Sequence, residues 1–411
     1  MSRKIAFITL GCKLNYAETA TYERAFMKHG YNVVPWQDKA DVYVINTCAV
    51  TERAEKKSRG EIRKVHRINP DAVIAVTGCA AQLRREQLAA IEGVSFVFGA
   101  EAKSELVPAI LGTELPDHKQ FFPAYSSGED RTRAFLKVQD GCDNFCAYCT
   151  VPFARGRSRN ASICEVTRQA REIAAAGVKE VVITGVNTGD FGRTTGESFL
   201  DLLKALNDVE GIERYRISSI EPNLITEETI DWIASGTKIL PHFHIPLQSG
   251  SDEILQRMGR RYTTEMFRHK VEYIRSRMET PGSAKVFFGI DLMVGLPGES
   301  EKLFREGKEF IESLRPAFLH VFPYSRRPGT RADKMPDQVP DYIKTERVAE
   351  MEALCRELHE SFAAAHKGMK EYVLFESSER DGMMSGYTRN YIKVTRPYDA
   401  SLVGKTVEVI L

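Results

Sequence analysis

Three cysteines lie in one short segment of the chain, where Cys142, Cys146 and Cys149 follow the spacing C-x3-C-x2-C. The spacing constrains the fold because a single loop supplies three thiolates to one place. An iron–sulfur cube has four irons and is normally held by four thiolates. Three thiolates leave one iron free for a small ligand, much as a catalytic zinc keeps an open position. The segment therefore predicts a redox enzyme.

Zinc is the alternative occupant of such a loop. A structural zinc takes four ligands, typically including a second pair of cysteines or paired histidines. The nearest histidine in the sequence is His118, and no second cysteine pair lies close by. The pattern favours an iron–sulfur cluster, and a non-catalytic metal-containing RNA-binding protein is the alternative of a different class.

The composition is that of a globular protein with a substantial core. The 411 residues are 43% hydrophobic and carry a net charge of +1, so the chain as a whole does not attract nucleic acid. No apolar run approaches the length of a membrane span, and the run after Lys4 is too short for a signal peptide. We therefore expect a cytoplasmic protein, not bound to a membrane, with reduced cysteines. Grouped cysteines in that compartment usually bind metal or take part in catalysis.

The first part of the chain alternates strands and helices. Apolar runs predict strands at residues 4–10, 42–46 and 73–77, and helical stretches cover residues 17–29, 54–67 and 82–91. Strands separated by helices indicate a parallel, doubly wound α/β sheet. We assign this N-terminal domain to residues 1–111.

Three further cysteines follow the predicted strands of this domain. Cys12, Cys48 and Cys79 each lie just beyond the carboxyl end of one strand. Open α/β sheets build their ligand sites at that edge, so the three thiols are expected to meet in a second three-thiolate site. The alternative is three small buried thiols with no further role.

The central part of the chain, residues 132–368, predicts a parallel barrel. Six strand candidates lie at residues 135–138, 181–184, 215–218, 243–246, 286–294 and 318–323. Six β/α units fall short of the usual eight and give a partial (β/α)6 barrel that is open on one side. Polar or glycine-rich segments follow the strands, at the face where barrel enzymes place their chemistry, and the cysteine loop follows the first strand.

Two other regions complete the α/β fold. Residues 112–131 contain glycine, proline, serine and charge, and predict a linker. A helix at residues 344–367 leads to residues 369–411, whose short β-rich runs predict a small β module.

Local patches are candidates for contact with RNA. Arg155, Arg157 and Arg159 alternate after the cysteine loop and either lie in a solvated segment or bind phosphate. The helix at residues 54–67 has an excess of basic residues. Residues 386–391 combine aromatic side chains with an arginine, as surfaces for single-stranded nucleic acid do.

The remaining motifs add little. Cys164 and Cys355 lie on helical stretches with apolar neighbours and are expected to be buried. The sequence contains no P-loop, dinucleotide-binding fingerprint, serine nucleophile elbow or zinc-protease helix.

With these motifs, the chain resembles the radical-SAM methylthiotransferases over essentially its whole length. C-x3-C-x2-C is typical of the radical-SAM superfamily. The segments Leu10-Gly-Cys12, Asn46-Thr-Cys48 and Gly78-Cys79 are typical of the methylthiotransferases within it. The run LGCKLN from Leu10 is similar to the branch that acts on N6-threonylcarbamoyladenosine in tRNA. The isopentenyladenosine branch tends to read FGCQMN, and the branch that modifies a ribosomal-protein aspartate tends to read LGCPKN.

The resemblance implies two 4Fe–4S clusters and S-adenosyl-L-methionine (SAM) as cofactors. Cys142, Cys146 and Cys149 are expected to hold the cluster whose open iron binds SAM. Cys12, Cys48 and Cys79 are expected to hold an auxiliary cluster that carries the sulfur. The residues expected to contact SAM are Tyr148, Gly185, Asn187, Glu221, Gln248 and Gly295.

The resemblance also implies the reaction and the partners. A methylthio group would be inserted at C2 of N6-threonylcarbamoyladenosine in the anticodon loop of a tRNA, with a reductant such as flavodoxin or ferredoxin and a TRAM-like RNA-binding tail. We assign no catalytic side chain, because the C2–H of adenine is not acidic enough for an ordinary base. Methylthiotransferases of isopentenyladenosine or of a ribosomal-protein aspartate are the alternatives within the family.

Overall fold

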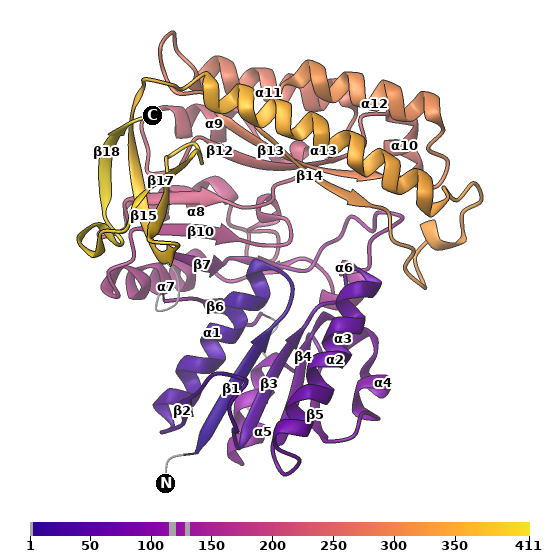
Figure 1. Cartoon of the computed structure of the whole chain (residues 1–411), viewed down its shortest axis with the longest axis vertical. Helices are drawn as coiled ribbons and strands as arrows, with labels where there is room; N and C mark the ends of the chain where they lie inside the picture. The colour runs from indigo at the N-terminus through magenta and orange to yellow at the C-terminus, as the bar shows by residue number, and fades with distance from the viewer. Residues whose placement is uncertain (1–2, 115–120, 128–131) are drawn as a thin grey trace.

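The computed structural model describes residues 3–114, 121–127 and 132–411. It has an N-terminal domain, a central barrel and a C-terminal β module (Figure 1). Residues 115–120 and 128–131 of the predicted linker lie outside the described residues. Within the linker range, Ala124–Tyr125 forms the short strand β6, which pairs antiparallel with the first barrel strand, β7 (Arg133–Lys137).

The N-terminal domain is built on a five-stranded parallel sheet of order β2-β1-β3-β4-β5. Its strands are β1 (Lys4–Thr9), β2 (Asn32–Val33), β3 (Val42–Thr47), β4 (Val73–Gly78) and β5 (Val94–Phe98). The three predicted strands are present, and β2 and β5 were not predicted. The central strand β3 is buried along its whole length, as expected for a parallel strand covered on both faces.

Helices cover this sheet and connect its strands. They are α1 (Lys13–Lys28), α2 (Glu52–Ile68), α3 (Cys79–Leu83), α4 (Arg85–Ala89) and α5 (Leu106–Leu111). The prediction of one helix over residues 82–91 is wrong, because the backbone leaves the helical region at Arg84 (φ −135°, ψ 37°). The first of the two resulting helices begins at Cys79, immediately after β4.

All six predicted barrel strands are present. After β7 they are β10 (Glu180–Thr184), β11 (Arg214–Ile217), β12 (His242–Gln248), β13 (Phe287–Val294) and β14 (Phe318–Pro323). Neighbouring strands are parallel, and β11 meets β12 through the bridges Tyr215–Ile239 and Ser219–His244. Because the outer edge of β7 pairs with β6 rather than with β14, the barrel is open between its first and last strands.

Short elements shape the mouth of the barrel, and long helices surround it. The short ones are β8 (Gln139–Asp140), α6 (Val151–Arg155) and β9 (Arg159–Asn160). The longer ones are α7 (Ile163–Ala175), α8 (Phe199–Asn207), α9 (Glu227–Ala234), α10 (Asp252–Arg257), α11 (Thr264–Met278), α12 (Glu301–Leu314) and α13 (Asp341–Ala364). Helix α7 begins as predicted, because the Ser162 side chain accepts a hydrogen bond from the backbone N–H of Glu165.

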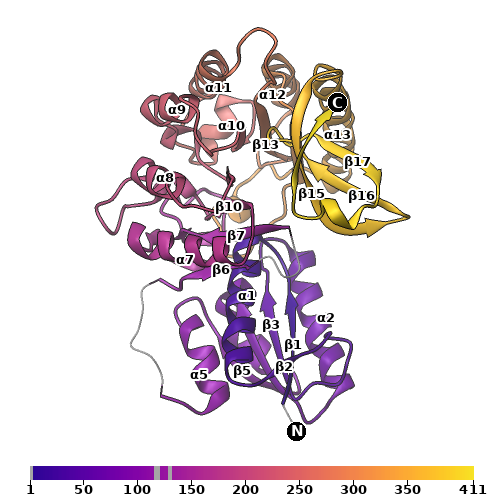
Figure 2. The ribbon, with the colours of Figure 1, turned by 90° about the vertical axis from the view of Figure 1, so that its left-hand side faces the viewer.

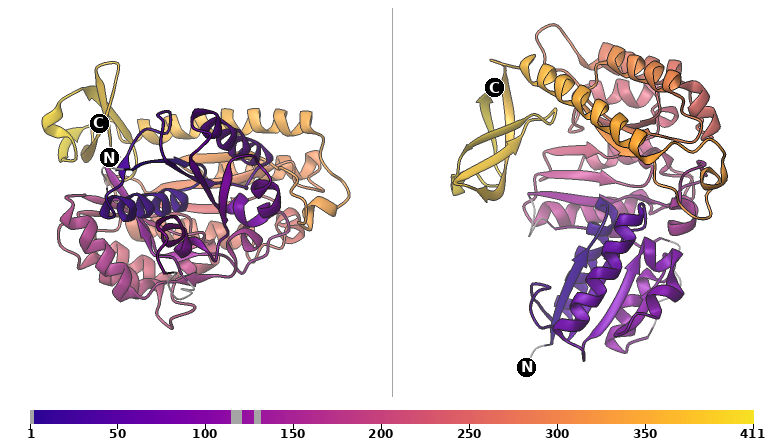
Figure 3. Two further views of the ribbon diagram at one scale, coloured as in Figure 1. Left: turned by 90° about the horizontal axis from the view of Figure 1, so that it is seen from below. Right: turned by 45° about the vertical axis from the view of Figure 1, so that its right-hand side comes forward.

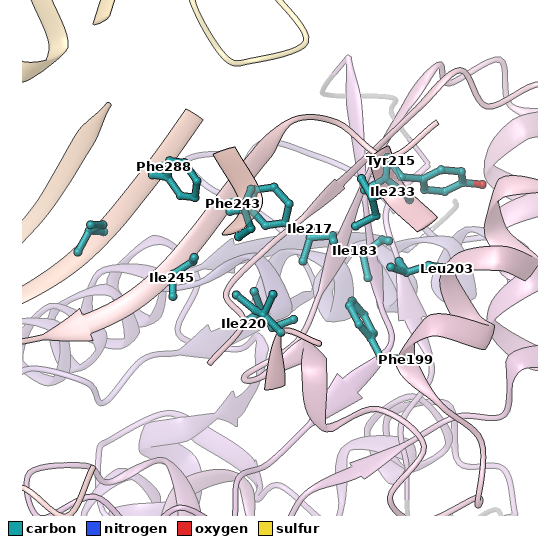
Figure 4. Close-up of a cluster of buried hydrophobic side chains, with 14 of the residues drawn as sticks. Ile183, Phe199, Leu203, Tyr215, Ile217, Ile220, Ile233, Phe243, Ile245 and Phe288 are labelled. Carbon is teal, nitrogen blue, oxygen red and sulfur yellow. The ribbon is translucent and has the colours of Figure 1, made fainter. Parts of the chain in front are cut away.

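The barrel core lies between the strands and the surrounding helices. Figure 4 shows alternate side chains of β11 and β12, among them Tyr215, Ile217, Phe243 and Ile245, packed with residues of α8 such as Leu203. Burial of each large apolar side chain contributes about 1.5–3 kcal/mol. Since these positions face the helices, the side chains between them on each strand point into the barrel.

The C-terminal module is a four-stranded antiparallel sheet of order β17-β16-β15-β18. Its strands are β15 (Lys370–Arg380), β16 (Met383–Tyr387), β17 (Lys393–Pro397) and β18 (Thr406–Ile410), of which β16 was not predicted. The module lies beside the amino ends of the barrel strands (Figure 2). Its contacts there include Arg133 with Glu376 at 2.6 Å and Arg214 with the carbonyl of Tyr387 at 3.3 Å.

The N-terminal domain directs the carboxyl ends of its strands toward the barrel (Figures 1 and 3). Buried ion pairs cross this contact: Lys137 of β7 binds Glu18 of α1 at 2.8 Å, and Arg327 binds Glu55 of α2. The loops that follow β1, β3 and β4 therefore lie at the boundary between the two domains. Within the described residues, no helix has the length and apolarity that a membrane crossing requires.

Candidate active site

The barrel triad, Cys142, Cys146 and Cys149, lies on the loop between β8 and α6. The loop can form because Gly141 adopts φ 74°, and a Cβ atom there would lie 2.0 Å from the carbonyl oxygen of Arg157. Backbone N–H groups point at two of the sulfurs, at 3.5 Å for Cys142 and 3.4 Å for Cys149. Such N–H···S contacts favour thiolates and tune clusters that thiolates hold.

Arg260 connects the barrel triad to the strand ends. Its guanidinium donates to the sulfur of Cys146 at 2.9 Å and to the hydroxyl of Tyr148 at 3.2 Å, and it pairs with Glu221. Burial raises the pKa of Glu221, and Arg260 opposes that rise. The arginine thus brings together a cysteine and two of the residues expected to contact SAM.

Burial also acts on the thiols of the barrel triad. It raises the pKa of Cys142 to about 11 and that of Cys149 to about 12. Buried thiols of this kind release their protons when a metal binds, so metal binding and deprotonation are coupled here.

The N-terminal triad, Cys12, Cys48 and Cys79, comes together at the carboxyl edge of the first sheet. A Cβ on Gly11 would lie 2.9 Å from Cβ and 3.0 Å from Sγ of Cys48, so the loop carrying Cys12 lies directly against Cys48. Burial raises the pKa of Cys48 and of Cys79, and the neighbouring thiols of the triad raise both further. The three strand-end cysteines therefore lie close to one another, as the prediction of a shared site requires.

Asn15 and Gly78 hold these loops in place. The Asn15 amide donates to the carbonyls of Leu10 at 2.7 Å and of Thr47 at 3.0 Å, and so ties the end of β1 to the end of β3. Gly78 adopts φ 96°, and a Cβ there would lie 2.4 Å from the carbonyl of Thr47. The close approach of these backbones depends on the missing side chain.

Arg155 links the two triads. It lies at the end of α6, the helix that follows Cys149, and is 3% exposed. Its guanidinium donates to the sulfur of Cys12 at 3.9 Å and to the carboxylate of Asp140 at 3.0 Å. Neither sequence interpretation of Arg155, a solvated charge or a phosphate contact, is correct, whereas Arg157 is exposed.

Arg155 belongs to a buried ionic network with an excess of positive charge. The Glu18 carboxylate accepts hydrogen bonds from Lys103 at 2.7 Å, Lys137 at 2.8 Å and Arg155 at 3.2 Å. The Asp140 carboxylate accepts a hydrogen bond from Lys137 at 2.7 Å. Burial alone would raise the pKa of the Asp140 carboxyl, but the surrounding lysines and arginines hold this pKa well below its usual range. Arg159 also pairs with Asp140, at 3.4 Å, so four cations face two carboxylates. The network therefore carries excess positive charge beside the N-terminal triad, and this charge suits thiolate ligands.

The other residues expected to contact SAM lie at the carboxyl ends of the barrel strands. Asn187 follows β10, donates its backbone N–H to Gln139 at 2.9 Å and accepts from the backbone N–H of Glu221 at 3.2 Å. Gly185 lies next to Gln139, because a Cβ there would be 3.0 Å from its side-chain oxygen. These residues surround the same strand ends from which the barrel triad extends.

Gln248 and Gly295 end the next two strands. Gln248 has φ 70° at an irregularity in the pairing of β12 with β13. Gly295 donates its N–H to Glu299 at 2.8 Å, and a Cβ there would lie 2.3 Å from the Lys344 side chain. The backbone N–H of Gly295 is thus already bonded within the protein.

The spacing of the thiols bears on the zinc alternative. Tetrahedral zinc–thiolate bonds of about 2.3 Å bring ligand sulfurs to about 3.8 Å from one another. Among the described residues, the ligand atoms of His244, Asp291 and His320 all lie within 4.8 Å of one another, and neither cysteine triad is gathered that tightly. Neither triad is therefore gathered tightly enough, as it stands, for a single zinc ion.

One predicted RNA patch and one cysteine differ from expectation. Tyr387 and Tyr391 stack on each other with centroids 4.6 Å apart, and Arg133 of the barrel lies over both rings, so this patch faces the barrel. Cys164 is exposed, contrary to the prediction, because it lies in the first turn of α7, whereas Cys355 is buried.

Sequence reasoning did not identify Arg155, Arg260 or Glu18 as site residues. Glu18 offered one signal, since it lies four residues before the buried Tyr22 in a helix that packs against the sheet. Arg260 is part of no recognisable motif, and only the folded chain places it against Cys146.

Two family models match the chain. The model described as "Uncharacterized protein family UPF0004" matches residues 4–99, and the Radical SAM superfamily model matches residues 136–311. The first range covers the N-terminal sheet, and the second covers most of the barrel.

Curated relatives match nearly the whole chain. A threonylcarbamoyladenosine tRNA methylthiotransferase of Bacillus subtilis is 40% identical over 98% of this chain and 93% of that protein. Its counterpart in Aquifex aeolicus is 37% identical over 99% of this chain and 100% of that protein. A tRNA-2-methylthio-N(6)-dimethylallyladenosine synthase of Carboxydothermus hydrogenoformans is 32% identical over 98% and 95%.

Among solved structures, the radical SAM methyltransferase TsrM from Kitasatospora setae superposes with a TM-score of 0.60, covering 81% of this chain and 77% of that one. The identity is 16%, so this likeness concerns the fold. Because curated relatives more than 30% identical match the chain almost from end to end, it belongs to the radical-SAM methylthiotransferases.

Proposed function

We propose that this protein inserts a methylthio group at C2 of N6-threonylcarbamoyladenosine in tRNA, with 4Fe–4S clusters and SAM as cofactors. One observation carries the proposal: two cysteine triads on separate domains adjoin the same boundary, and Arg155 reaches from the helix after the barrel triad to Cys12. The relatives that carry this substrate in their names are 34–40% identical to the chain.

In this proposal each domain holds one cluster. Cys142, Cys146 and Cys149 would bind the cluster that supplies the electron for SAM cleavage, and the N-terminal triad would bind the auxiliary cluster. The chain's own residues orient and shield the reactants: Tyr148, Arg260 and Glu221 form one wall of the SAM site. The buried ionic network keeps the two domains in register.

The chemistry of the substrate agrees with this division of work. The C2–H of an adenine is too weakly acidic for a side-chain base, so a cofactor has to carry the difficult step while the protein supplies position and excludes water. A base in an anticodon loop is unpaired, and its extrusion costs at most a few kcal/mol. A reductant such as flavodoxin or ferredoxin would reduce the barrel cluster, and an enzyme that modifies tRNA would act in the cytoplasm.

The cluster assignment is tested by anaerobic reconstitution with iron and sulfide. The wild-type chain should bind about eight irons, and the triple variant Cys142→Ala, Cys146→Ala, Cys149→Ala about four. Cys164→Ala, which removes an exposed thiol outside both triads, is the matched control and should keep the full count. A colourless, zinc-loaded protein would contradict the proposal.

The substrate assignment is tested by nucleoside mass spectrometry on tRNA from a strain that lacks this protein. The 2-methylthio derivative of N6-threonylcarbamoyladenosine should disappear and return when the wild-type chain is supplied. An unchanged level would reject this substrate, and loss of the isopentenyladenosine derivative instead would move the chain to the other tRNA branch.

A further inference from the structure

Arg216 is a buried arginine whose hydrogen-bonding capacity is largely unused. It is 3% exposed, and its Nε donates to Glu180 at 3.0 Å. Within the described part of the chain, both of its terminal nitrogens lack a hydrogen-bond partner. A buried guanidinium with two unpaired amino groups is costly unless a ligand satisfies it.

The position of Arg216 on β11 directs it into the barrel. Its neighbours Tyr215 and Ile217 pack into the core beneath the helices, so the side chain between them faces the interior. The ring of Tyr391 lies 4.5 Å from the guanidinium carbon and closes the amino end of the barrel on that side. The two terminal nitrogens of the Arg216 guanidinium are therefore available to a ligand inside the barrel.

Lys13 brings a second cation to this region from the other domain. It is the first residue of α1, directly after Cys12, and it is exposed to solvent. Burial, and then the charges of Arg216 and Arg133, lower its pKa, whereas Asp291 raises it. The charges of Arg216, Arg133 and Asp291 act on Lys13, so its ammonium group lies near these side chains, and we call the region between the four of them the recess.

The carboxylate that faces Lys13 is already engaged. Asp291 of β13 accepts a hydrogen bond from His244 of β12 at 2.6 Å. His320 of β14 stacks on His244 with centroids 4.8 Å apart, and burial lowers its pKa to about 4, so it is neutral near pH 7. Asp291 therefore only partly balances the cations around it.

The charges on the residues named above, together with Arg214 and Glu376, leave this recess positive. The cations are Lys13, Arg133, Arg214 and Arg216, and the carboxylates are Glu180, Asp291 and Glu376. One positive charge is in excess. Although His244, Asp291 and His320 lie close enough to hold a metal ion, the adjacent lysine and arginine disfavour a cation there. The recess suits an anion.

We propose that Lys13 and Arg216 form a receptor for the threonyl carboxylate of the modified adenosine, and this rests on the function proposed above. The N6-threonylcarbamoyl group carries one free carboxylate at its far end. The two unpaired amino groups of an arginine match a carboxylate in a bidentate geometry. A base placed between the two triads would extend this substituent along the inner wall of the barrel.

The receptor also accounts for discrimination between tRNA substrates. An isopentenyl group has no charge, so it would leave the two terminal nitrogens of Arg216 without a partner and would bind the positive recess poorly. The residue after the first cysteine is Lys13 here and glutamine in the FGCQMN motif. Lys13→Gln is therefore a conservative way to remove the charge.

The proposal is tested by measuring the binding of holoenzyme to anticodon stem-loop RNAs. The RNAs carry either N6-threonylcarbamoyladenosine or its methyl ester, in which one methyl group replaces the negative charge of the carboxylate. Wild-type protein should bind the acid about 10-fold more tightly than the ester, as a hydrogen bond to a charged group implies. Lys13→Gln should lose most of this preference, and Lys13→Arg should retain it.

Lys28→Gln is the matched control, because Lys28 is an exposed lysine at the opposite end of the same helix. It should bind both RNAs as the wild type does. Equal wild-type affinity for acid and ester, or an equal loss on both RNAs in Lys13→Gln, would overturn the receptor. Formation of methylthio product by the wild type is scored separately, so failure of the proposed function is distinguished from failure of the receptor.

Discussion

The guanidinium of Arg155 donates a hydrogen bond to the sulfur of Cys12 at 3.9 Å, although the two residues are 143 positions apart in the chain. Arg155 ends the helix that follows the barrel triad, and Cys12 belongs to the N-terminal triad. One side chain thus connects the two candidate cluster sites, and its charge is buried with them.

This contact predicts an electrostatic effect on the auxiliary cluster. A positive charge beside a cysteine ligand favours the reduced cluster, so Arg155→Met should lower its midpoint potential by about 60 mV, equivalent to ~1.4 kcal/mol for one electron. The measurement is a redox titration followed by electron paramagnetic resonance, in a background that lacks the barrel triad. Arg157→Met, which removes an exposed neighbouring charge, should change the potential far less. Equal shifts in both variants would show that Arg155 has no special role.

The buried carboxylate of Glu18 is predicted to hold the domains together. It is fully buried and accepts hydrogen bonds from Lys103 of the N-terminal domain and from Lys137 and Arg155 of the barrel. Glu18→Gln leaves those cations without their shared partner and should lower the free energy of unfolding by about 3–5 kcal/mol. Urea denaturation measures this loss. Glu86→Gln, on an exposed face of α4, should have little effect.

The same network predicts how stability depends on pH. Burial would raise the pKa of Glu18, but Lys103, Lys137 and Arg155 lower it below the ordinary value of 4.5, and Asp140 is likewise held below 3.8. A carboxyl group whose pKa is lower in the folded protein than in the unfolded chain stabilises the fold at pH values above its unfolded-state pKa. This stability is lost as the pH falls through the folded-state pKa. The wild type should therefore lose stability on acidification from about pH 4.5 downward. Glu18→Gln should be less stable at neutral pH but lose less below that point.

Gly141 is predicted to be required for the barrel triad. Gly141→Ala would place a Cβ 2.0 Å from the carbonyl of Arg157, in a backbone conformation with φ 74°. The cysteine loop would have to shift, and iron content after reconstitution should fall by about half. Gly112→Ala has a similar φ of 70° with open space around it, and should cost only the ~1–2 kcal/mol of backbone strain. Full iron content in Gly141→Ala would contradict the assignment of the loop.

Much of the fold was predictable because its signals are local. Short apolar runs between helical stretches located all six barrel strands and three strands of the N-terminal sheet. Strand β16 escaped notice because its residues, Met383–Tyr387, include a serine and a glycine and do not form an apolar run. Gly386 has to be glycine there, since a Cβ would lie 2.5 Å from the side chain of Val373.

The partners of the site residues were less predictable. The alternation of Arg155, Arg157 and Arg159 suggested equivalent surface charges, yet the first is buried and ion-paired while the second is exposed. Tyr387 and Tyr391 suggested an RNA surface, yet they pack against Arg133 of the barrel. In each case the deciding contact comes from a segment far away in the chain.

The sequence by itself determined where the cysteines stand relative to the strands, and hence the prediction of two three-thiol sites, because spacing and periodicity are properties of neighbouring residues. Only the tertiary structure decided which charges surround those sites. Lys13 and Arg216 become a pair only when the N-terminal domain closes against the open side of the barrel, because burial and electrostatic pairing depend on atoms that folding brings together.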